Sequence, residues 1–152
     1  MNYKIDADTM KSLQKAQKNE ITEHHIYLKL SSLIKNEHNS KILQQIARDE
    51  LRHHDELKKF TGTAKKPNTL KIYFYTFISM IFGITFGIKL MERGEESSEK
   101  LYRELGENIK EFKRIAKEED KHEKELVEII EEERLKFVGS MVLGLNDALV
   151  EL

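Results

Sequence analysis

Two stretches, IARDELRH at residues 46–53 and IAKEEDKH at residues 115–122, repeat one another and decide the fold. Both read isoleucine, alanine, a base, an acid, glutamate, one further residue, a base and histidine. Each copy therefore contains the motif Glu-x-x-His. Because three residues advance an α-helix by about 300°, the glutamate and the histidine of each motif share one face of the helix. Each copy can bring a carboxylate and an imidazole to one small volume.

A glutamate–tyrosine pair precedes each copy of the repeat. Tyr27 follows Glu20 by seven residues, and Tyr102 follows Glu95 at the same offset. Seven residues make about two helical turns, so each tyrosine lies on the same stripe as its glutamate. The tyrosines are predicted to hydrogen-bond to carboxylates of the site and hold them in place, with radical chemistry as the less favoured alternative.

Apolar residues recur at helical spacing along most of the chain, which predicts four long helices. They cover about residues 8–35, 40–60, 91–105 and 107–136, with a loop at residues 61–68. An uncharged run, residues 72–88, joins the first pair of helices to the second. Two antiparallel helix hairpins with one long apolar crossover make an all-α, ferritin-like four-helix bundle.

The four helices supply two single glutamates and two Glu-x-x-His motifs, the ligand inventory of a carboxylate-bridged dinuclear metal centre. The predicted ligands are Glu20, Glu50, His53, Glu95, Glu119 and His122. Four carboxylates balance two divalent cations, and hard oxygen ligands favour iron or manganese, with zinc as a further substitute. The alternative is a solvated acidic face with surface histidines. It does not explain why Glu50 and Glu119 fall in the inward register of their helices.

Two further glutamates are candidates for additional metal ligands. Glu23 lies one turn after Glu20, and Glu92 lies one turn before Glu95. Each is either an additional, mobile carboxylate ligand or an exposed acid.

The other histidines are weaker candidates for ligands. His54 also reaches the inward face, but the second copy of the repeat has Glu123 at that place, which favours His53. The remaining histidines have no partner in the repeat and are predicted to lie on the surface: His24, His25 and His38.

Composition excludes several classes of function. The 152 residues fit one domain with a real core. The 26 basic and 27 acidic residues nearly cancel, so no broad positive field exists to bind nucleic acid. The chain has no cysteine, which excludes disulfides, zinc ribbons, iron–sulfur clusters and thiol catalysis. The polar first residues, MNYKIDADTMKS, contain no signal-peptide core and predict a cytoplasmic location.

The pattern Glu20/Tyr27, Glu50-x-x-His53, Glu95/Tyr102 and Glu119-x-x-His122 resembles the rubrerythrin-type branch of the ferritin-like diiron proteins, over about residues 7–136. The final stretch, FVGSMVLGLNDALVEL, resembles the opening of the first membrane helix of vacuolar-iron-transporter-type proteins. The run TFISMIFGITFGIKLMERGEE is similar to the crossover of erythrin domains. In this order, the parts resemble a membrane-bound ferritin, in which an erythrin domain precedes such a transporter.

The resemblance implies two parts: a diiron (erythrin) domain at residues 1–136, and the start of a transporter membrane helix at residues 137–152. The same six metal ligands carry over, with Glu23 as a seventh. Asp147 and Glu151 would belong to the iron path of the transporter, and the chain is then expected to be truncated. The implied location is the cytoplasmic face of a membrane.

The implied activity is binding of two iron ions and oxidation of ferrous iron by oxygen or peroxide, for iron handling or delivery to the transporter. Without cysteine there is no rubredoxin-like centre, so an electron donor would be a separate protein. One alternative is a soluble rubrerythrin-like peroxidase with an external reductase. Another is a non-catalytic regulatory or dimerisation domain, and a metal-free helical module is the weakest candidate.

The apolar run at residues 72–88 reaches the lower length limit of a membrane span. A span there would separate the two hairpins, so that the six ligands could never meet. We therefore expect the run to pack on the bundle as an ordinary core helix, with Gly83 and Gly87 allowing close approach. Contact with a second copy in a homodimer, or with a membrane surface, are the alternatives.

Overall fold

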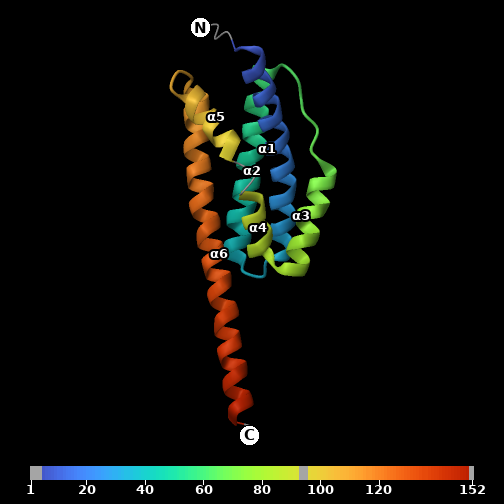
Figure 1. Ribbon diagram of the computed structural model, residues 1–152, viewed down its shortest axis with the longest axis vertical. Coiled ribbons are helices and arrows are strands. Elements are labelled where there is room, and N and C mark those ends of the chain that lie inside the picture. Colours follow the sequence, from blue (N-terminus) through green and yellow to red (C-terminus); the bar gives the residue numbers. More distant parts are fainter. Residues whose placement is uncertain (1–4, 93–95, 151–152) are drawn as a thin grey trace.

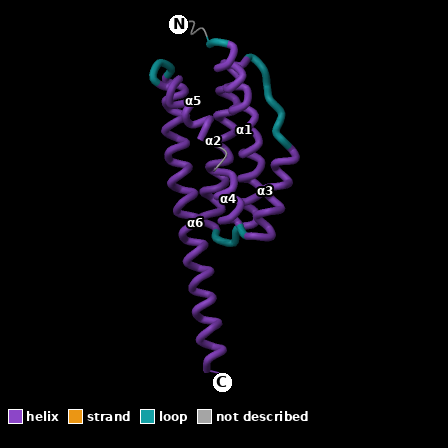
Figure 2. Tube along the Cα trace, viewed as in Figure 1, coloured by secondary structure: helices purple, strands orange, loops and turns teal. Residues whose placement is uncertain are grey.

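The computed structural model describes residues 5–92 and 96–150, which form helices joined by loops and contain no strand (Figures 1 and 2). The helices are α1 (Ala7–Leu33), α2 (Glu37–Thr61), α3 (Thr69–Phe82), α4 (Ile84–Glu92), α5 (Glu96–Gly106) and α6 (Lys110–Val150). The all-α class and the ferritin-like bundle are confirmed. The predicted first and second helices match α1 and α2 to within three residues at each end.

Helices α1 and α2 form the predicted antiparallel hairpin. Asp6 caps α1 by accepting hydrogen bonds from the backbone N–H groups of Asp8 and Thr9. Asn36 caps α2 in the same way, and its side-chain amide donates to Glu132 of α6 at 2.8 Å. The turn of the hairpin is therefore fastened to α6 as well as closed on itself.

The apolar crossover, expected as one core helix, forms two helices. Gly83 ends α3 with φ +89°, a left-handed conformation that glycine adopts without strain. The chain reverses at this point, and α4 returns beside α3 (Figure 1). A Cβ atom at Gly87 would overlap the side chain of Ser79, so the two helices touch at a glycine, as the sequence predicts.

The expectation of an ordinary core helix is wrong for α3. The helix packs on α1, but among its side chains only Ile72 and Ser79 are buried. Helix α4 packs on α6 and buries Gly87, Ile88 and Met91. Each of α3 and α4 therefore packs on the bundle through one side only.

Helix α6 is longer than predicted. It was expected to end near Lys136, but it continues without a break to Val150 and extends beyond the bundle (Figure 1). Its buried residues stop at Ile130, and apolar side chains such as Phe137 and Met141 are exposed. The division at residue 136 stays a prediction. Within residues 5–92 and 96–150 we find no helix with both the length and the apolar character needed to cross a bilayer.

The core consists of two apolar clusters with a polar layer between them. One cluster gathers Ile26, Tyr27, Leu30, Leu43, Ile46, Ala47, Ile72, Ile88, Met91, Leu126, Ile129 and Ile130. The other gathers Leu13, Ala16, Leu57, Tyr102, Ile109, Phe112, Ile115 and Ala116. On each of α1, α2 and α6, the residues between the two clusters include the predicted metal ligands.

Candidate metal centre

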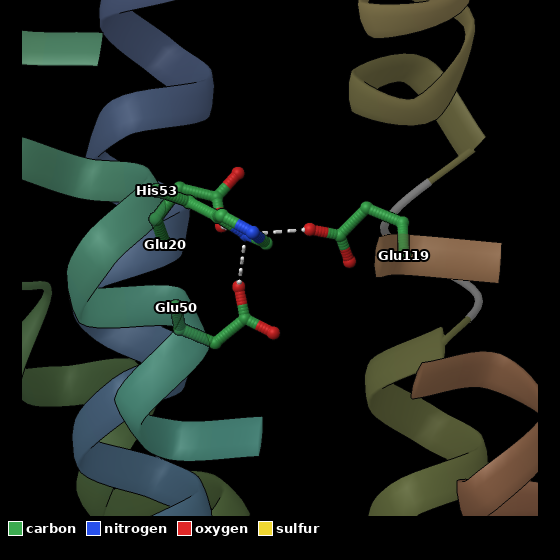
Figure 3. Close-up of side chains that lie close together, drawn as sticks. All are labelled: Glu20, Glu50, His53 and Glu119. Atoms are coloured by element: carbon green, nitrogen blue, oxygen red, sulfur yellow. Dashed lines mark hydrogen bonds and ion pairs between the residues drawn. The ribbon is translucent and has the colours of Figure 1, made fainter. Parts of the chain in front are cut away.

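The polar layer draws side chains from α1, α2 and α6. Glu20 comes from α1, Glu50 and His53 from α2, and Glu119 and His122 from α6. Glu20, Glu50, His53 and His122 are each at most 3% exposed, and Glu119 is partly buried. Figure 3 shows Glu20, Glu50, His53 and Glu119 pointing toward one another. The helical register of the repeat thus brings both of its copies to one buried volume.

The two imidazoles face the same carboxylates. Nδ1 of His53 lies 2.9 Å from Oε1 of Glu119 and 3.3 Å from Oε2 of Glu50. Nδ1 of His122 lies 3.1 Å from Oε1 of Glu50 and 3.6 Å from Oε2 of Glu119. Glu20 closes the group, with Oε2 at 3.7 Å from Nδ1 of His53. Ligand atoms of Glu20, Glu50, His53 and Glu119 all lie within 4.8 Å of one another.

A second pair of carboxylates holds the outer nitrogens of the imidazoles. Nε2 of His53 lies 2.8 Å from Oε2 of Glu118, and Nε2 of His122 lies 3.3 Å from Oδ2 of Asp49. A carboxylate only accepts, so Nε2 of each histidine donates and Nδ1 faces the cluster. Arg52 joins the two carboxylates, with Nη1 at 2.6 Å from Asp49 and Nη2 at 3.0 Å from Glu118.

Sequence reasoning missed these two acids, although the repeat carried the signal. Asp49 and Glu118 occupy the same place in the two copies, immediately before the ligand glutamate. Each acid serves the histidine of the other copy. Only the packing of α2 against α6 pairs them in this way.

Burial and the imidazoles set the charge of the carboxylates. Burial raises the pKa of Glu20 well above its usual range, and the hydrogen bond from His53 offsets this only in part. Burial also opposes ionisation of Glu50, but the contacts with His122 and His53 outweigh it and lower the pKa of Glu50. The layer therefore holds both a carboxylate that stays ionised and one that is costly to ionise.

The imidazoles respond in the opposite direction. Burial alone would lower the pKa of His53, but the carboxylates of Glu118 and Glu119 raise it far above its usual value. Burial is likewise outweighed at His122, where Glu119 and Glu50 raise the pKa to about 11. The carboxylates of the layer therefore stabilise positive charge beside the Nδ1 atoms of the two histidines.

The donor atoms of the layer fit metal cations. Oε1 of Glu119 and Nδ1 of His122 are buried, and although each lies close to a polar atom of the layer, neither makes a hydrogen bond of suitable geometry. Buried polar atoms are rarely left in this state unless something else satisfies them. Carboxylate oxygens and imidazole nitrogens are ligands that iron accepts, and bound cations would balance the negative charge of the carboxylates.

The tyrosines reach across the bundle. Tyr102 of α5 is buried and donates a hydrogen bond to Oε1 of Glu20 on α1. Tyr27 of α1 donates to Oε1 of Glu92 on α4 at 3.5 Å. Tyr102 therefore makes the predicted kind of hydrogen bond, but its partner is Glu20 of α1. Glu95 lies outside the described residues.

Glu23 and Glu92, the two further candidate ligands, are both partly buried. Glu23 lines a cavity of about 30 Å³ with Lys71, and its pKa is raised well above the usual range by burial and by the charge of Glu20. Burial and the charges of Glu123 and Glu99 raise the pKa of Glu92 to about 7. A cavity of about 10 Å³ is lined by Tyr27, Glu50, Glu92, Glu99, Glu119, His122, Glu123 and Leu126. The roles of Glu23 and Glu92 as ligands stay predictions.

The remaining histidines do not join the layer. His54 is buried, but its Nε2 lies 3.2 Å from the carbonyl oxygen of Lys65, which favours His53 as the sequence suggests. His38 is exposed as predicted. His24 and His25 are only partly exposed, and Nδ1 of His24 lies 2.6 Å from the carbonyl oxygen of Ala47.

Comparison with known proteins gives one family. Residues 11–85 match the family model described as Rubrerythrin. The match includes Glu20, Glu50 and His53, whereas Glu119 and His122 lie beyond it on α6. Comparison with curated proteins and with solved structures returned no match.

Proposed function

Because residues 11–85 of this chain belong to the rubrerythrin family of ferritin-like diiron domains, we propose that the buried layer binds two iron ions and oxidises ferrous iron. The observation that carries this proposal is the buried group of Glu20, Glu50, His53 and Glu119, whose ligand atoms lie within 4.8 Å of one another. His122 adds a second imidazole beside the same carboxylates.

Glu50 and Glu119 would contribute carboxylate oxygens to both metal positions. Each presents one oxygen to Nδ1 of His53 and the other oxygen to Nδ1 of His122, at 2.9–3.6 Å. His53 and Glu20 would then complete one metal position, and His122 would hold the other. We propose that Glu95 completes the second position.

When bound, two ferrous ions supply one electron each, which suits the two-electron reduction of peroxide to water. Protons consumed in that reduction have to cross a buried layer, where the protein holds them on imidazoles and carboxylates. Asp49 and Glu118 hold the orientation of the two imidazoles throughout. The hydrogen bond from Tyr102 fixes one oxygen of Glu20 and limits how that carboxylate can turn.

We propose that this chemistry serves iron handling at the cytoplasmic face of a membrane, in the context of an iron transporter. Support comes from the resemblance of residues 137–152 to the opening of a transporter membrane helix. It also comes from α6, which leads from Glu119 and His122 directly into this segment.

Ferrous oxidation tests the proposed function. The chain is loaded with ferrous iron without oxygen, and then peroxide or oxygen is added while ferric absorbance is followed. We expect rapid oxidation, which Glu50→Gln abolishes and Glu111→Gln, a change of an exposed acid on α6, leaves intact. Full iron loading without faster oxidation than free ferrous iron would instead favour a regulatory domain. Turnover that continues only with an added electron donor would favour the peroxidase.

A further inference from the structure

Helix α3 turns most of its apolar side chains to solvent. The large ones are spaced by three or four residues along one stripe, the α3 face: Leu70, Tyr73, Phe74, Phe77, Met80 and Ile81. Each is at least half exposed, and Leu70 is 80% exposed. The opposite side of the helix packs on α1, and Figure 1 shows α3 at the edge of the bundle. An apolar stripe of this length on the outside of a protein indicates an interaction surface.

Basic residues predominate in the stretch of sequence that contains α3. From Leu57 to Met91 the sequence contains six lysines and no aspartate or glutamate, in a chain whose net charge is −1. Lys29 of α1 adds a further positive charge, with Nζ 5.8 Å from the ring centre of Tyr73. Lys71 and Lys89, which bracket the uncharged run, are exposed.

Acidic side chains from neighbouring elements do not cancel this charge. Glu23 of α1 lies beside Lys71 in a cavity with partly buried walls. Glu133 of α6, near the turn between α3 and α4, pairs with Lys136 at 3.2 Å. The solvent side of α3 therefore carries aromatic and aliphatic groups, with the positive charges of Lys29 and Lys71 beside them.

We propose that the α3 face binds the surface of a bilayer that contains anionic phospholipids. Apolar side chains of such a helix enter the boundary between headgroups and acyl chains, while lysines attract anionic headgroups. The 14 residues of α3 are too few to span a bilayer, so the helix would lie flat on it. The predicted homodimer is the competing occupant, but pairing this segment with its copy would also bring like-charged lysines together.

The α3 face is independent of the metal layer. The layer is formed by α1, α2 and α6, and α3 approaches it through Ile72 in one apolar cluster and through Lys71, which shares a small cavity with Glu23. Exposed side chains of α3 can therefore be changed without touching a proposed ligand. The exposed apolar segment of α6 after Phe137 is a separate surface, and its contribution has to be removed in the test.

Tryptophan fluorescence tests the proposal because the chain contains no tryptophan. Phe74→Trp and Ile81→Trp report on the two ends of the α3 face, and Val127→Trp on α6 is the matched exposed control. All three variants carry Phe137→Ser and Met141→Ser, so that the end of α6 cannot dominate. Unchanged circular dichroism and iron loading show that each variant is folded.

The variants are mixed with phosphatidylcholine vesicles with and without phosphatidylglycerol. We expect a blue shift, and quenching by brominated lipid, at positions 74 and 81 but not at position 127, and only with phosphatidylglycerol present. No shift, or a shift at position 81 alone, would overturn the proposal. A shift that appears without vesicles as protein concentration rises would assign the α3 face to a second copy instead.

Lysine substitution tests the electrostatic part. Each lysine near an anionic membrane surface increases the binding constant by about fivefold. Lys29→Gln with Lys89→Gln should therefore weaken vesicle binding by roughly 25-fold. The matched control, Lys110→Gln with Lys124→Gln, changes two exposed lysines on α6 and should leave binding within about twofold. Equal weakening by both pairs would show only a general charge effect and contradict the assignment to α3.

Discussion

At the scale of single residues, each of the two histidines is oriented by an acid from the other copy of the repeat. The acid that precedes the ligand glutamate of one copy contacts Nε2 of the histidine of the other copy, through Asp49 and Glu118. The hydrogen bond with His53 lowers the pKa of Glu118 to about 2, so this carboxylate remains ionised at neutral pH. A fixed anion on the outer nitrogen orients the imidazole and strengthens it as a ligand.

Removing this anion should weaken metal binding while leaving every proposed ligand in place. Glu118→Gln is expected to lower the affinity for the metal by about 10- to 100-fold. Competition with a chelator of known affinity measures the change. Glu128→Gln on the exposed side of α6 is the control and should match the wild type. An unchanged affinity for Glu118→Gln would mean that the contact with His53 does not orient the ligand.

The hydroxyl of Tyr102 provides a second test at this scale. Tyr102→Phe keeps the ring that stacks on Phe112 but removes the hydrogen bond to the buried carboxylate of Glu20. We expect the metal-free protein to lose about 1–3 kcal/mol of unfolding free energy, because Glu20 loses a partner in the core. Urea denaturation measures the loss. Tyr73→Phe, at a 65% exposed tyrosine, should change nothing, and equal effects would contradict the account.

At the scale of the helices, the approach of α3 to α4 depends on a glycine. Gly87→Ala would drive a Cβ atom into the side chain of Ser79. We expect a loss of about 1–3 kcal/mol, seen as a lower thermal midpoint, because the packed helices have to move apart. Gly139→Ala is the matched change in the exposed part of α6, where no atom lies within 4 Å of the new Cβ. It should be neutral or stabilising, since alanine favours helix.

The helices also show which features of the fold the sequence can specify. The ends of α1 and α2 are predicted to within three residues because polar residues and Gly62 interrupt the apolar pattern, although the caps are Asp6, where Asp8 or Thr9 was expected, and Asn36, where the helix was expected to begin at Ser40. The turn at Gly83 is not predicted, since it lies inside an uninterrupted apolar run where neither charge nor periodicity changes. The end of α6 is missed for the opposite reason. An abrupt change of composition at Phe137 resembles a boundary, but apolar residues continue a helix as well as polar ones do.

At the scale of the whole molecule, two apolar clusters enclose one polar layer. The sequence predicts that layer because a repeated motif places its members in the inward register of α2 and α6. It cannot predict the exposed side of α3, because exposure depends on which helices happen to cover it. It also cannot pair Asp49 with His122, a contact that exists only once α2 and α6 pack together.

The buried carboxylates and imidazoles of the layer form a group that is compatible with bound cations. The matched family region ends at residue 85, so the repeat at residues 115–122 has to supply the second half of the site from α6. Without a cation, the layer relies on protonated imidazoles to balance its carboxylates. Removing the carboxylates that both imidazoles share should therefore abolish metal binding rather than merely reduce it.

Metal stoichiometry tests this central claim most directly. The chain is loaded anaerobically with ferrous iron, freed of excess, and analysed for iron beside the double variant Glu50→Ala/Glu119→Ala. We predict about two iron ions per chain in the wild type and none retained by the variant. A wild-type chain that retains no iron, or a variant that retains as much as the wild type, would contradict the diiron site.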